Sequence, residues 1–317
     1  MSVIRDANLV REVGRELSNW GKWGADDERG TLNYITAECI REAARLVKKG
    51  LTFRLGLNFD ADGPQIGQSW RSNPIHLMRY DGGDAAIGAM NFPGGWKLCD
   101  DMIIMPLQCS THWDALAHVY YDDQLYNGFS FAEVSSGGAN RNGIDKICQG
   151  VIGRGVLLDV ARFKKKDMLE GGYGITPDEL DACVRAQGVN IRPGDILCLR
   201  TGVIQKLLRD KDKESYGGNR PGLTFECVRW LHRNQIAAVV ADNTGIEVLP
   251  NGFSDGCRIP FHMVALRDMG LLLGELLDLE ALATDCDGDK VYDFLFVSPP
   301  LPITGATASP INPLAVK

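Results

Sequence analysis

Apolar and polar residues follow a helical period at the start of this 317-residue chain. Apolar side chains recur every three or four positions, at Leu9, Val13, Leu17 and Trp20. A second helix is predicted from Thr36, whose hydroxyl suits an N-cap, to the Lys48-Lys49-Gly50 stop. We therefore expect residues 1–50 to form a helical N-terminal elaboration.

The second half of the chain alternates between short apolar runs and helical patterns. The runs are GVLLDV (155–160), DILCLRT (195–201) and AAVVAD (237–242), and their near-continuous apolar character indicates strands buried on both faces. Between them, Thr176-Pro-Asp-Glu179 has the form of a capping box for a helix to about Gln187, and FECVRWLHR (225–233) predicts another helix. This alternation predicts an α/β fold, and because no linker or repeat interrupts it, we expect residues 1–317 to form one domain.

Residues 51–150 are harder to assign, because they are rich in Gly, Asp and aromatic residues. Only LTFRLGL (51–57) and DMIIMPLQ (101–108) read as strands. We expect this region to carry loops that build a functional site.

Composition excludes several classes of function. The chain is 44% hydrophobic and 24% charged, as expected of a globular protein, and its net charge of −7 gives no basic surface for nucleic acid. Neither a Walker loop nor a G-x-G-x-x-G pattern occurs, so a nucleotide cofactor is not expected. Nine scattered cysteines without a C-x-x-C pair, a charged N-terminus and Leu-rich stretches broken by acids predict a cytoplasmic protein that does not enter membranes.

Two of the five histidines lie in one short segment, Gln108-Cys-Ser-Thr-His112-Trp-Asp114-Ala-Leu-Ala-His118. If the strand that starts near Asp101 continues here, Gln108, His112 and Asp114 share one face. Imidazole, carboxylate and amide oxygen then converge, a set that suits Zn²⁺, Mn²⁺ or Fe²⁺. The alternative is that His112 and Asp114 are a hydrogen-bonded pair beside a buried Trp113.

A second group of candidate residues comes later in the chain. A helix-like segment carrying His262 runs into a Gly-flanked apolar strand that ends at Glu275. Taken alone, this pattern favours a core or surface histidine at His262 and a solvated acid at Glu275 over a functional pair.

Two apparent nucleophiles are set aside. Gly252-Phe-Ser254-Asp-Gly256 matches a nucleophile elbow, but prolines flank it and no histidine follows His262, so we interpret it as a turn. Cys109 is three positions from His112 and would face the opposite side of a strand.

The segment from Gln108 to His118 resembles the signature H-x-G-T-H-x-D-x-P-x-H of the metal-dependent cyclase/hydrolase family, which includes kynurenine formamidase, isatin hydrolase and trans-dienelactone hydrolase. Thr111, His112, Asp114 and His118 match, whereas Gln108, Ser110 and Leu116 depart from it. Further similarity covers most of the chain, at residues 23–33, 193–202, 221–223, 241–247 and 309–315.

This resemblance implies a fold and a set of roles. The fold is a central mixed β-sheet or barrel-like β core flanked by helices, of the swivelling β/β/α type. The metal ligands are Gln108, His112, Asp114, His262 and Glu275, holding one or two Mn²⁺ or Zn²⁺ ions, and His118 is the acid/base. Because an amide oxygen is a harder ligand than imidazole, Gln108 favours Mn²⁺.

The chemistry that follows is hydrolysis. A divalent ion can activate water and polarise a carbonyl, and His118 can move the proton, which suits the opening of a small lactone or cyclic amide to a carboxylate. The alternatives are an arylformamidase or isatin-type amidase and, from another class, a non-catalytic metal- or small-molecule-binding relative. By analogy with the family we also expect a homodimer or homotetramer.

Overall fold

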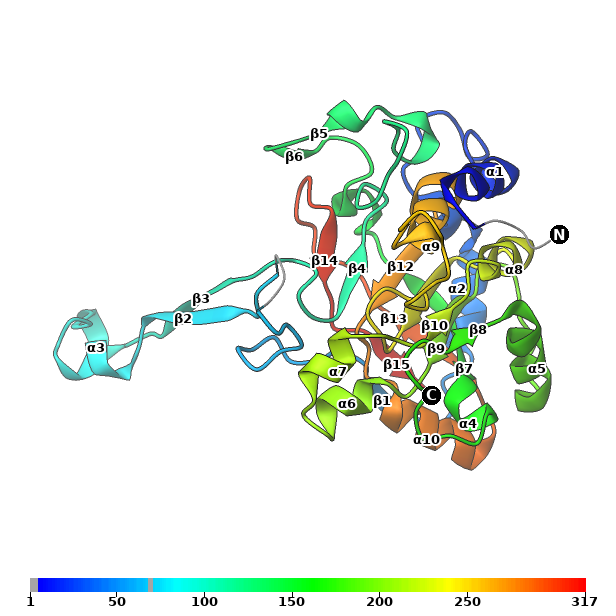
Figure 1. Cartoon of the computed structure of the whole chain (residues 1–317). Helices are drawn as coiled ribbons and strands as arrows, with labels where there is room; N and C mark the ends of the chain where they lie inside the picture. The colour runs from blue at the N-terminus through cyan, green and yellow to red at the C-terminus, as the bar shows by residue number, and fades with distance from the viewer. Residues whose placement is uncertain (1–4, 68–70) are drawn as a thin grey trace.

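The computed structural model describes residues 5–67 and 71–317, so the first four residues of the predicted N-terminal elaboration lie outside it. Its central feature is a nine-stranded sheet in the order β1-β15-β13-β7-β9-β11-β12-β4-β14 (Figure 1). The strands are β1 (Thr52–Arg54), β4 (His112–Asp114), β7 (Ile152–Asp159), β9 (Ile196–Arg200), β11 (Ala238–Ala241), β12 (Leu272–Glu275), β13 (Asp293–Val297), β14 (Ala308–Pro310) and β15 (Leu314–Val316). Strands β7, β9, β11 and β12 are parallel, and the other neighbours pair antiparallel.

Helices and short strand pairs surround this sheet. The α-helices are α1 (Ala7–Leu17), α2 (Ala37–Ala44), α3 (Gly82–Ala86), α4 (Val160–Phe163), α5 (Pro177–Gln187), α6 (Ile204–Leu208), α7 (Lys213–Gly217), α8 (Cys227–Arg233), α9 (Pro260–His262) and α10 (Glu280–Asp289). The short 3-10 turns are η1 (Gly30–Tyr34), η2 (Pro93–Gly95), η3 (Tyr126–Gly128), η4 (Phe131–Glu133) and η5 (Ile144–Ile147), and η6 (Met263–Met269) is π-helical. The pairs are β2 (Ile75–Tyr80) with β3 (Asp100–Ile104), β5 (Val134–Ser135) with β6 (Gly138–Ala139), and β8 (Gly174–Ile175) with β10 (Gly222–Leu223).

The predicted α/β alternation is confirmed. All three apolar runs are buried strands, α5 begins at a capping box in which Thr176 and Glu179 bond each other's backbone, and Thr36 accepts from the Cys39 amide at the start of α2. Within residues 5–50 the regular elements are all helical. The predicted strand over 51–57 shrinks to the three residues of β1, which lies at the edge of the sheet.

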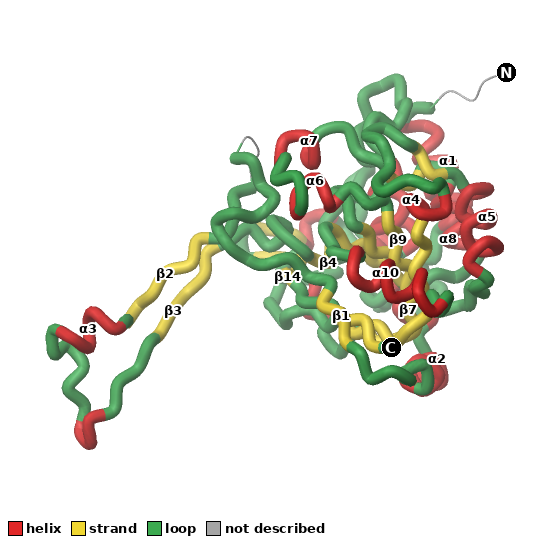
Figure 2. The backbone as a smooth tube through the Cα atoms, turned by 90° about the horizontal axis from the view of Figure 1, so that it is seen from below, coloured by secondary structure: helices red, strands yellow, loops and turns green. Residues whose placement is uncertain are grey.

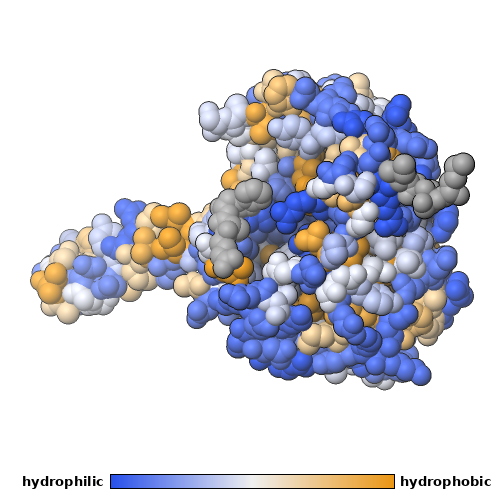
Figure 3. All heavy atoms as spheres, viewed as in Figure 1, coloured by the Kyte–Doolittle hydropathy of each residue, from blue (hydrophilic) through white to orange (hydrophobic). Residues whose placement is uncertain are grey.

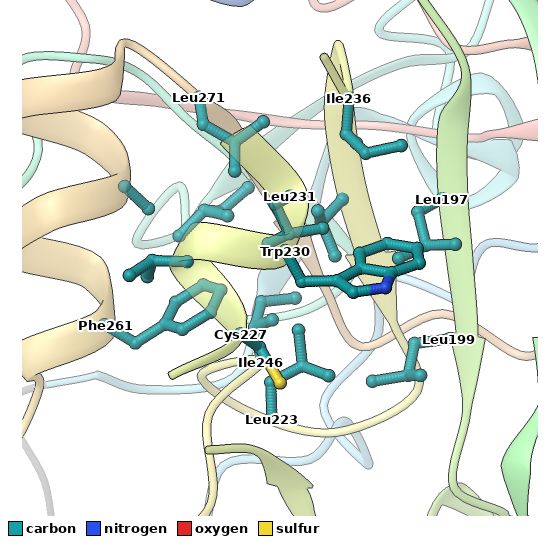
Figure 4. Close-up of a cluster of buried hydrophobic side chains, with 14 of the residues drawn as sticks. Leu197, Leu199, Leu223, Cys227, Trp230, Leu231, Ile236, Ile246, Phe261 and Leu271 are labelled. Atoms are coloured by element: carbon teal, nitrogen blue, oxygen red, sulfur yellow. The ribbon is translucent and has the colours of Figure 1, made fainter. Parts of the chain in front are cut away.

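The central strands bury both faces because their side chains alternate between two layers of core. Val156, Leu197 and Val239 belong to the layer covered by α1, α5, α8 and η6. Figure 4 shows part of this layer, where Trp230 and Leu231 of α8 lie with side chains of β9. The intervening residues Leu157 and Cys198 face the other layer, which α10 covers. Full burial on both sides explains why the stretches 155–158, 196–199 and 238–241 of these strands are entirely apolar.

The sheet is curled into a half-barrel. β4 and β13 are far apart in the strand order, yet the rings of Trp113 and Phe296 lie 6.3 Å apart. The indole nitrogen of Trp113 also donates to the backbone oxygen of Ser298 at 3.0 Å, just beyond β13. The second core layer, which includes Trp113 and Phe296, therefore fills the inside of the curl. No helix among residues 5–67 and 71–317 has both the length and the apolar character needed to cross a bilayer.

One prediction about continuity is wrong. The strand that starts near Asp101 does not continue to Asp114, because β3 ends at Ile104 and β4 begins at His112. Gln108 lies in the intervening turn. β3 instead pairs with β2 to form an arm that extends away from the body, as Figure 2 shows from below. The apolar run 102–105 has the same sequence pattern as a core strand. The pattern of apolar residues therefore predicts one continuous strand from Asp101 to Asp114, although the structure has two separate strands.

Candidate metal centre

Two paired strands position the centre of the site. In the β4–β12 pair, Glu275 lies opposite His112 and Leu273 opposite Asp114. Because side chains alternate along a strand, the side chains of His112, Asp114 and Glu275 lie on one face while Trp113 points to the inside of the curl. Gly274 lies opposite Trp113, and a Cβ atom there would be 2.7 Å from the indole. The packing of the Trp113 ring against β12 thus requires glycine at position 274.

Three buried side chains form a compact group. One ligand atom from each of His112, Asp114 and Glu275 lies within 4.8 Å of the other two. The Nε2 atom of His112 is 3.3 Å from Oδ1 of Asp114 and 3.9 Å from Oε2 of Glu275. These side chains are at most 7% exposed. The alternative that Glu275 is a solvated acid is therefore wrong.

Two atoms of this group lack the partners that buried polar atoms normally have. The Nδ1 atom of His112 lies 2.7 Å from the backbone oxygen of Ser110, which can only accept, so Nδ1 carries a proton and Nε2 is the ring atom that could bind an ion. Within the described residues, neither this Nε2 nor Oδ1 of Asp114 has a hydrogen-bond partner. Such unpaired atoms are costly in a protein interior. A neutral imidazole nitrogen and carboxylate oxygens that converge on one point fit a divalent cation.

His262 lies beside this group and is held by a residue that the sequence analysis did not assign. Its Nε2 atom is 3.2 Å from Oε1 of Glu275, and its Nδ1 atom is 2.6 Å from Oε1 of the buried Glu247. Burial opposes the charged form, but the two carboxylates outweigh it and raise the pKa of His262 to about 10. In the ion-free protein His262 therefore donates to both acids. Its role as a metal ligand stays a prediction.

Glu247 could have been recognised from its surroundings. It stands between the apolar residues Ile246 and Val248 and is only 1% exposed. Its carboxylate also accepts from the backbone amides of Phe261 and His262, both at 3.2 Å. A buried acid that bonds the first turn of a helix and the ring of its histidine orients that ring.

His118 is the histidine of the cluster most open to solvent. Its side chain is 24% exposed, and Nε2 lies 3.6 Å from Oδ1 of Asp114. Burial lowers the pKa of His118, with Asp114 opposing the shift only in part, so the ring is neutral at pH 7. An accessible neutral imidazole beside a buried carboxylate is suited to accept a proton from a reacting group.

Gln108 contacts His118 at the edge of the cluster. Its amide nitrogen lies 3.3 Å from Nδ1 of His118. Because the two ends of an amide are assigned from their surroundings, this contact is equally an amide oxygen accepting from Nδ1–H, which would leave Nε2 as the base. The structure thus brings all six predicted site residues into one region, from segments that are far apart in the chain.

Neither of the two apparent nucleophiles, Ser254 and Cys109, is suited to catalysis here. Ser254 is in a turn, as predicted, and donates to the backbone oxygen of Arg5. Cys109 is fully buried, and burial raises the pKa of its thiol, which disfavours the reactive thiolate.

With this fold and this cluster, the chain belongs to the Cyclase family, whose model matches residues 51–248. A crystal structure described as a novel cyclase is 40% identical, with a TM-score of 0.88 over 96% of this chain and 99% of the other. No match is found among curated proteins.

More distant solved structures share the fold. Isatin hydrolase A from Labrenzia aggregata is 18% identical, with a TM-score of 0.60 over 86% of this chain and 94% of the other. A predicted metal-dependent hydrolase from Bacillus stearothermophilus is 17% identical, with a TM-score of 0.52 over 84% and 97%. The curled mixed sheet flanked by helices is therefore a cyclase-type fold, as the sequence predicted.

The amide of Gln108 could either orient the ring of His118 or bind the metal ion, and its contact with His118 favours the first role. We expect Gln108→Leu to keep the relative affinities for Zn²⁺ and Mn²⁺ while kcat falls roughly 10–100-fold, as for other residues that orient a working histidine. Gln108→His should leave the metal preference unchanged as well. Titrating both ions into the wild type and the two variants checks this, and a shift toward Zn²⁺ in Gln108→His would instead place the amide oxygen in the ligand set.

Proposed function

We propose that this protein is a metal-dependent hydrolase that opens a small lactone or cyclic amide to a carboxylate. The observation that carries the proposal is the pair of buried, unpartnered atoms, Nε2 of His112 and Oδ1 of Asp114, next to Glu275. These three residues would hold one Mn²⁺ or Zn²⁺ ion. His262, 3.2 Å from Glu275, would be available to a second ion, whereas Gln108, which contacts His118, would orient that ring.

In the proposed reaction the ion would activate water and the carbonyl, and side chains of the protein would move the proton and hold the ligands in place. When bound, a divalent ion supplies an acidified water and a Lewis acid for the carbonyl. His118 would take the proton from the attacking water at Nε2 and return it to the leaving alkoxide or amine. Asp114, which faces Nε2 of both His112 and His118, would keep the ring of His118 aligned. His262 and Glu247 would hold the carboxylate of Glu275 in place.

Limited access to the cluster supports a small substrate. His118 and Gln108 are partly exposed, whereas His112, Asp114, His262 and Glu275 are buried. A substrate would therefore reach the cluster from the side of His118. The product carboxylate would form next to the ion, where its charge is stabilised.

A cyclic amide is the second candidate within this class. The observation in its favour is the shared fold with isatin hydrolases, one of which was solved with the product analogue thioisatinate at a TM-score of 0.59 over 89% of this chain. The lactone and the cyclic amide require the same attack on a carbonyl and differ only in the leaving atom. Arylformamides would react in the same way.

Acid release from a substrate panel tests the proposal. The protein should be purified without chelator, analysed for metal, and assayed with simple lactones, isatin and an arylformamide in the presence of Mn²⁺ or Zn²⁺. We expect metal-stimulated release of one acid per turnover with at least one substrate class, and its loss after chelation. Stoichiometric metal without hydrolysis of any class would overturn the substrate assignment, and failure to bind metal after reconstitution would support the non-catalytic relative.

A further inference from the structure

A positively charged side chain lies on the open side of the candidate metal centre. Nη1 of Arg71 donates to the backbone oxygen of Gln108 at 3.5 Å, and the side-chain amide of Gln108 lies 3.3 Å from Nδ1 of His118. Arg71 is half-buried, and His118 is the histidine of the cluster most open to solvent. Arg71 therefore stands on the side from which a substrate would reach the cluster.

Hydrogen bonds fix the backbone on which Arg71 stands. The side chain of the nearby Asn73 accepts from the backbone amide of Gln65 and donates to the backbone oxygen of the same residue, both at 2.9 Å. The side chain of Gln65 in turn donates to the backbone oxygen of Cys109 at 2.8 Å. The segment that carries Arg71 is thus tied to the turn that carries Gln108, and this link holds the guanidinium at a defined place beside the site.

The charge of Arg71 acts on residues of this turn and of the cluster. Burial lowers the pKa of His118, Asp114 opposes the shift, and the positive charges of His262 and Arg71 strengthen it. Burial raises the pKa of the Cys109 thiol, and the charge of Arg71 opposes that rise. The guanidinium is therefore close enough to the cluster to act on a molecule bound there.

A guanidinium is suited to bind a carboxylate. Its N–H donors form a planar fork that matches the two oxygens of a carboxylate, and arginine stays charged in proteins. Arg71 precedes β2, so it lies at the base of the arm. On the face seen in Figure 3 the body beside the arm is largely hydrophilic, whereas apolar residues gather along the arm itself. A charged molecule can approach such a surface without losing much hydration.

We infer that Arg71 is a specificity-determining residue that binds a carboxylate carried by the substrate in addition to its reacting carbonyl. The inference rests on the proposed hydrolase function. The carbonyl would lie at the ion, and the carboxylate would lie beyond His118, beside Arg71. Gln108 contacts both side chains and would set the separation between the anion and the proton-transfer group. A neutral ring such as isatin would then bind less tightly than an anionic one.

Matched substrates that differ only in charge test the role of Arg71. They are γ-butyrolactone with a carboxylate on its ring, the corresponding carboxamide, and isatin with the same two substituents. We expect the wild type to prefer the carboxylates by roughly 10–100-fold in kcat/KM, mainly through KM, because a hydrogen bond to a charged group has this worth. Arg71→Gln should lose the preference and keep its activity on the carboxamides. Arg71→Lys should recover part of the preference, since it keeps the charge without the fork.

A purely structural role for Arg71 gives a different result. If Arg71 only holds the turn before β4, Arg71→Gln would lower kcat for carboxylates and carboxamides alike, and that result would overturn the inference. The control is Arg45→Gln, which removes an exposed arginine that pairs with Glu38. This variant should keep the wild-type preference for the carboxylates.

Equilibrium binding separates this inference from the proposed function. A cyclopentanone that carries a carboxylate keeps the ring, the carbonyl and the charge but cannot be hydrolysed, and its affinity is measured by calorimetry. We expect it to bind the wild type roughly 10–100-fold more tightly than Arg71→Gln. That result would support the anion site even if no lactone or amide were hydrolysed, in which case the hydrolase proposal alone would fail. Equal binding to the two proteins would overturn the inference, whatever the outcome of the substrate panel.

Discussion

Asp114→Asn should remove both bound metal and activity while the protein stays folded. The substitution takes one negative charge from the ligand set with almost no change in volume. We expect metal affinity to fall by at least about 100-fold, since even residues behind the ligands are worth 10–100-fold. Turnover should fall below detection. Metal content by mass spectrometry and acid release by pH-stat measure the two effects.

Thermal unfolding shows whether the fold is kept in this variant. Burial opposes ionisation of Asp114, but the neighbouring histidines outweigh it and hold its pKa below the usual range. The carboxylate is therefore ionised at neutral pH, where it lies 3.8 Å from the protonated ring of His262 in the ion-free fold, and the stabilisation from this pair is lost as the pH falls through the lowered pKa. Asp114→Asn should melt somewhat earlier and should gain no stability from added Mn²⁺, whereas the wild type gains about 2.7 kcal/mol at 100 times Kd. Asp122→Asn, which alters only the surface pair with Arg11, is the control. Full metal occupancy in Asp114→Asn would contradict the proposed ligand set.

His118→Ala should lose activity without losing metal. If His118 moves the proton, its removal should lower kcat by roughly 10²–10⁴-fold, the usual worth of a positioned acid/base. Because the pKa of His118 is lowered by burial, the acidic limb of the wild-type kcat/KM profile should lie below 6.5, its unperturbed value. That limb should disappear in the variant.

The partly buried His232 on α8 provides the matched control, because it lies outside the cluster. His232→Ala should retain activity and the acidic limb. Loss of metal from His118→Ala would move this residue into the ligand set and leave the proton transfer to another group.

Local patterns are sufficient to predict much of the fold. Continuous apolar runs identify β7, β9 and β11 because these strands are buried on both faces, and the capping box at Thr176 locates α5 because it reflects bonds within one turn. The arm is not predicted in this way. Its strands carry apolar runs although they are exposed, and in a single sequence this pattern is the same as that of a core strand.

The candidate metal site cannot be predicted from the spacing of apolar residues along the chain. His112 and Glu275 are brought together by the pairing of β4 with β12, across about 160 residues of chain, and no local pattern specifies which strands pair. The family resemblance indicates this grouping, and the geometry agrees with it. The resemblance does not predict that the amide of Gln108 contacts His118, since that depends on the turn before β4, nor does it indicate that Glu247 holds His262.

The position of the ion itself is the most direct test of the proposed centre. A crystal loaded with Zn²⁺ should show an anomalous peak roughly 2.0–2.2 Å from Nε2 of His112 and from carboxylate oxygens of Asp114 and Glu275. Nε2 of His118 should lie clearly farther from that peak. A stoichiometric ion bound elsewhere, or a zinc-saturated crystal with no peak between these three side chains, would contradict the assignment of a metal centre here.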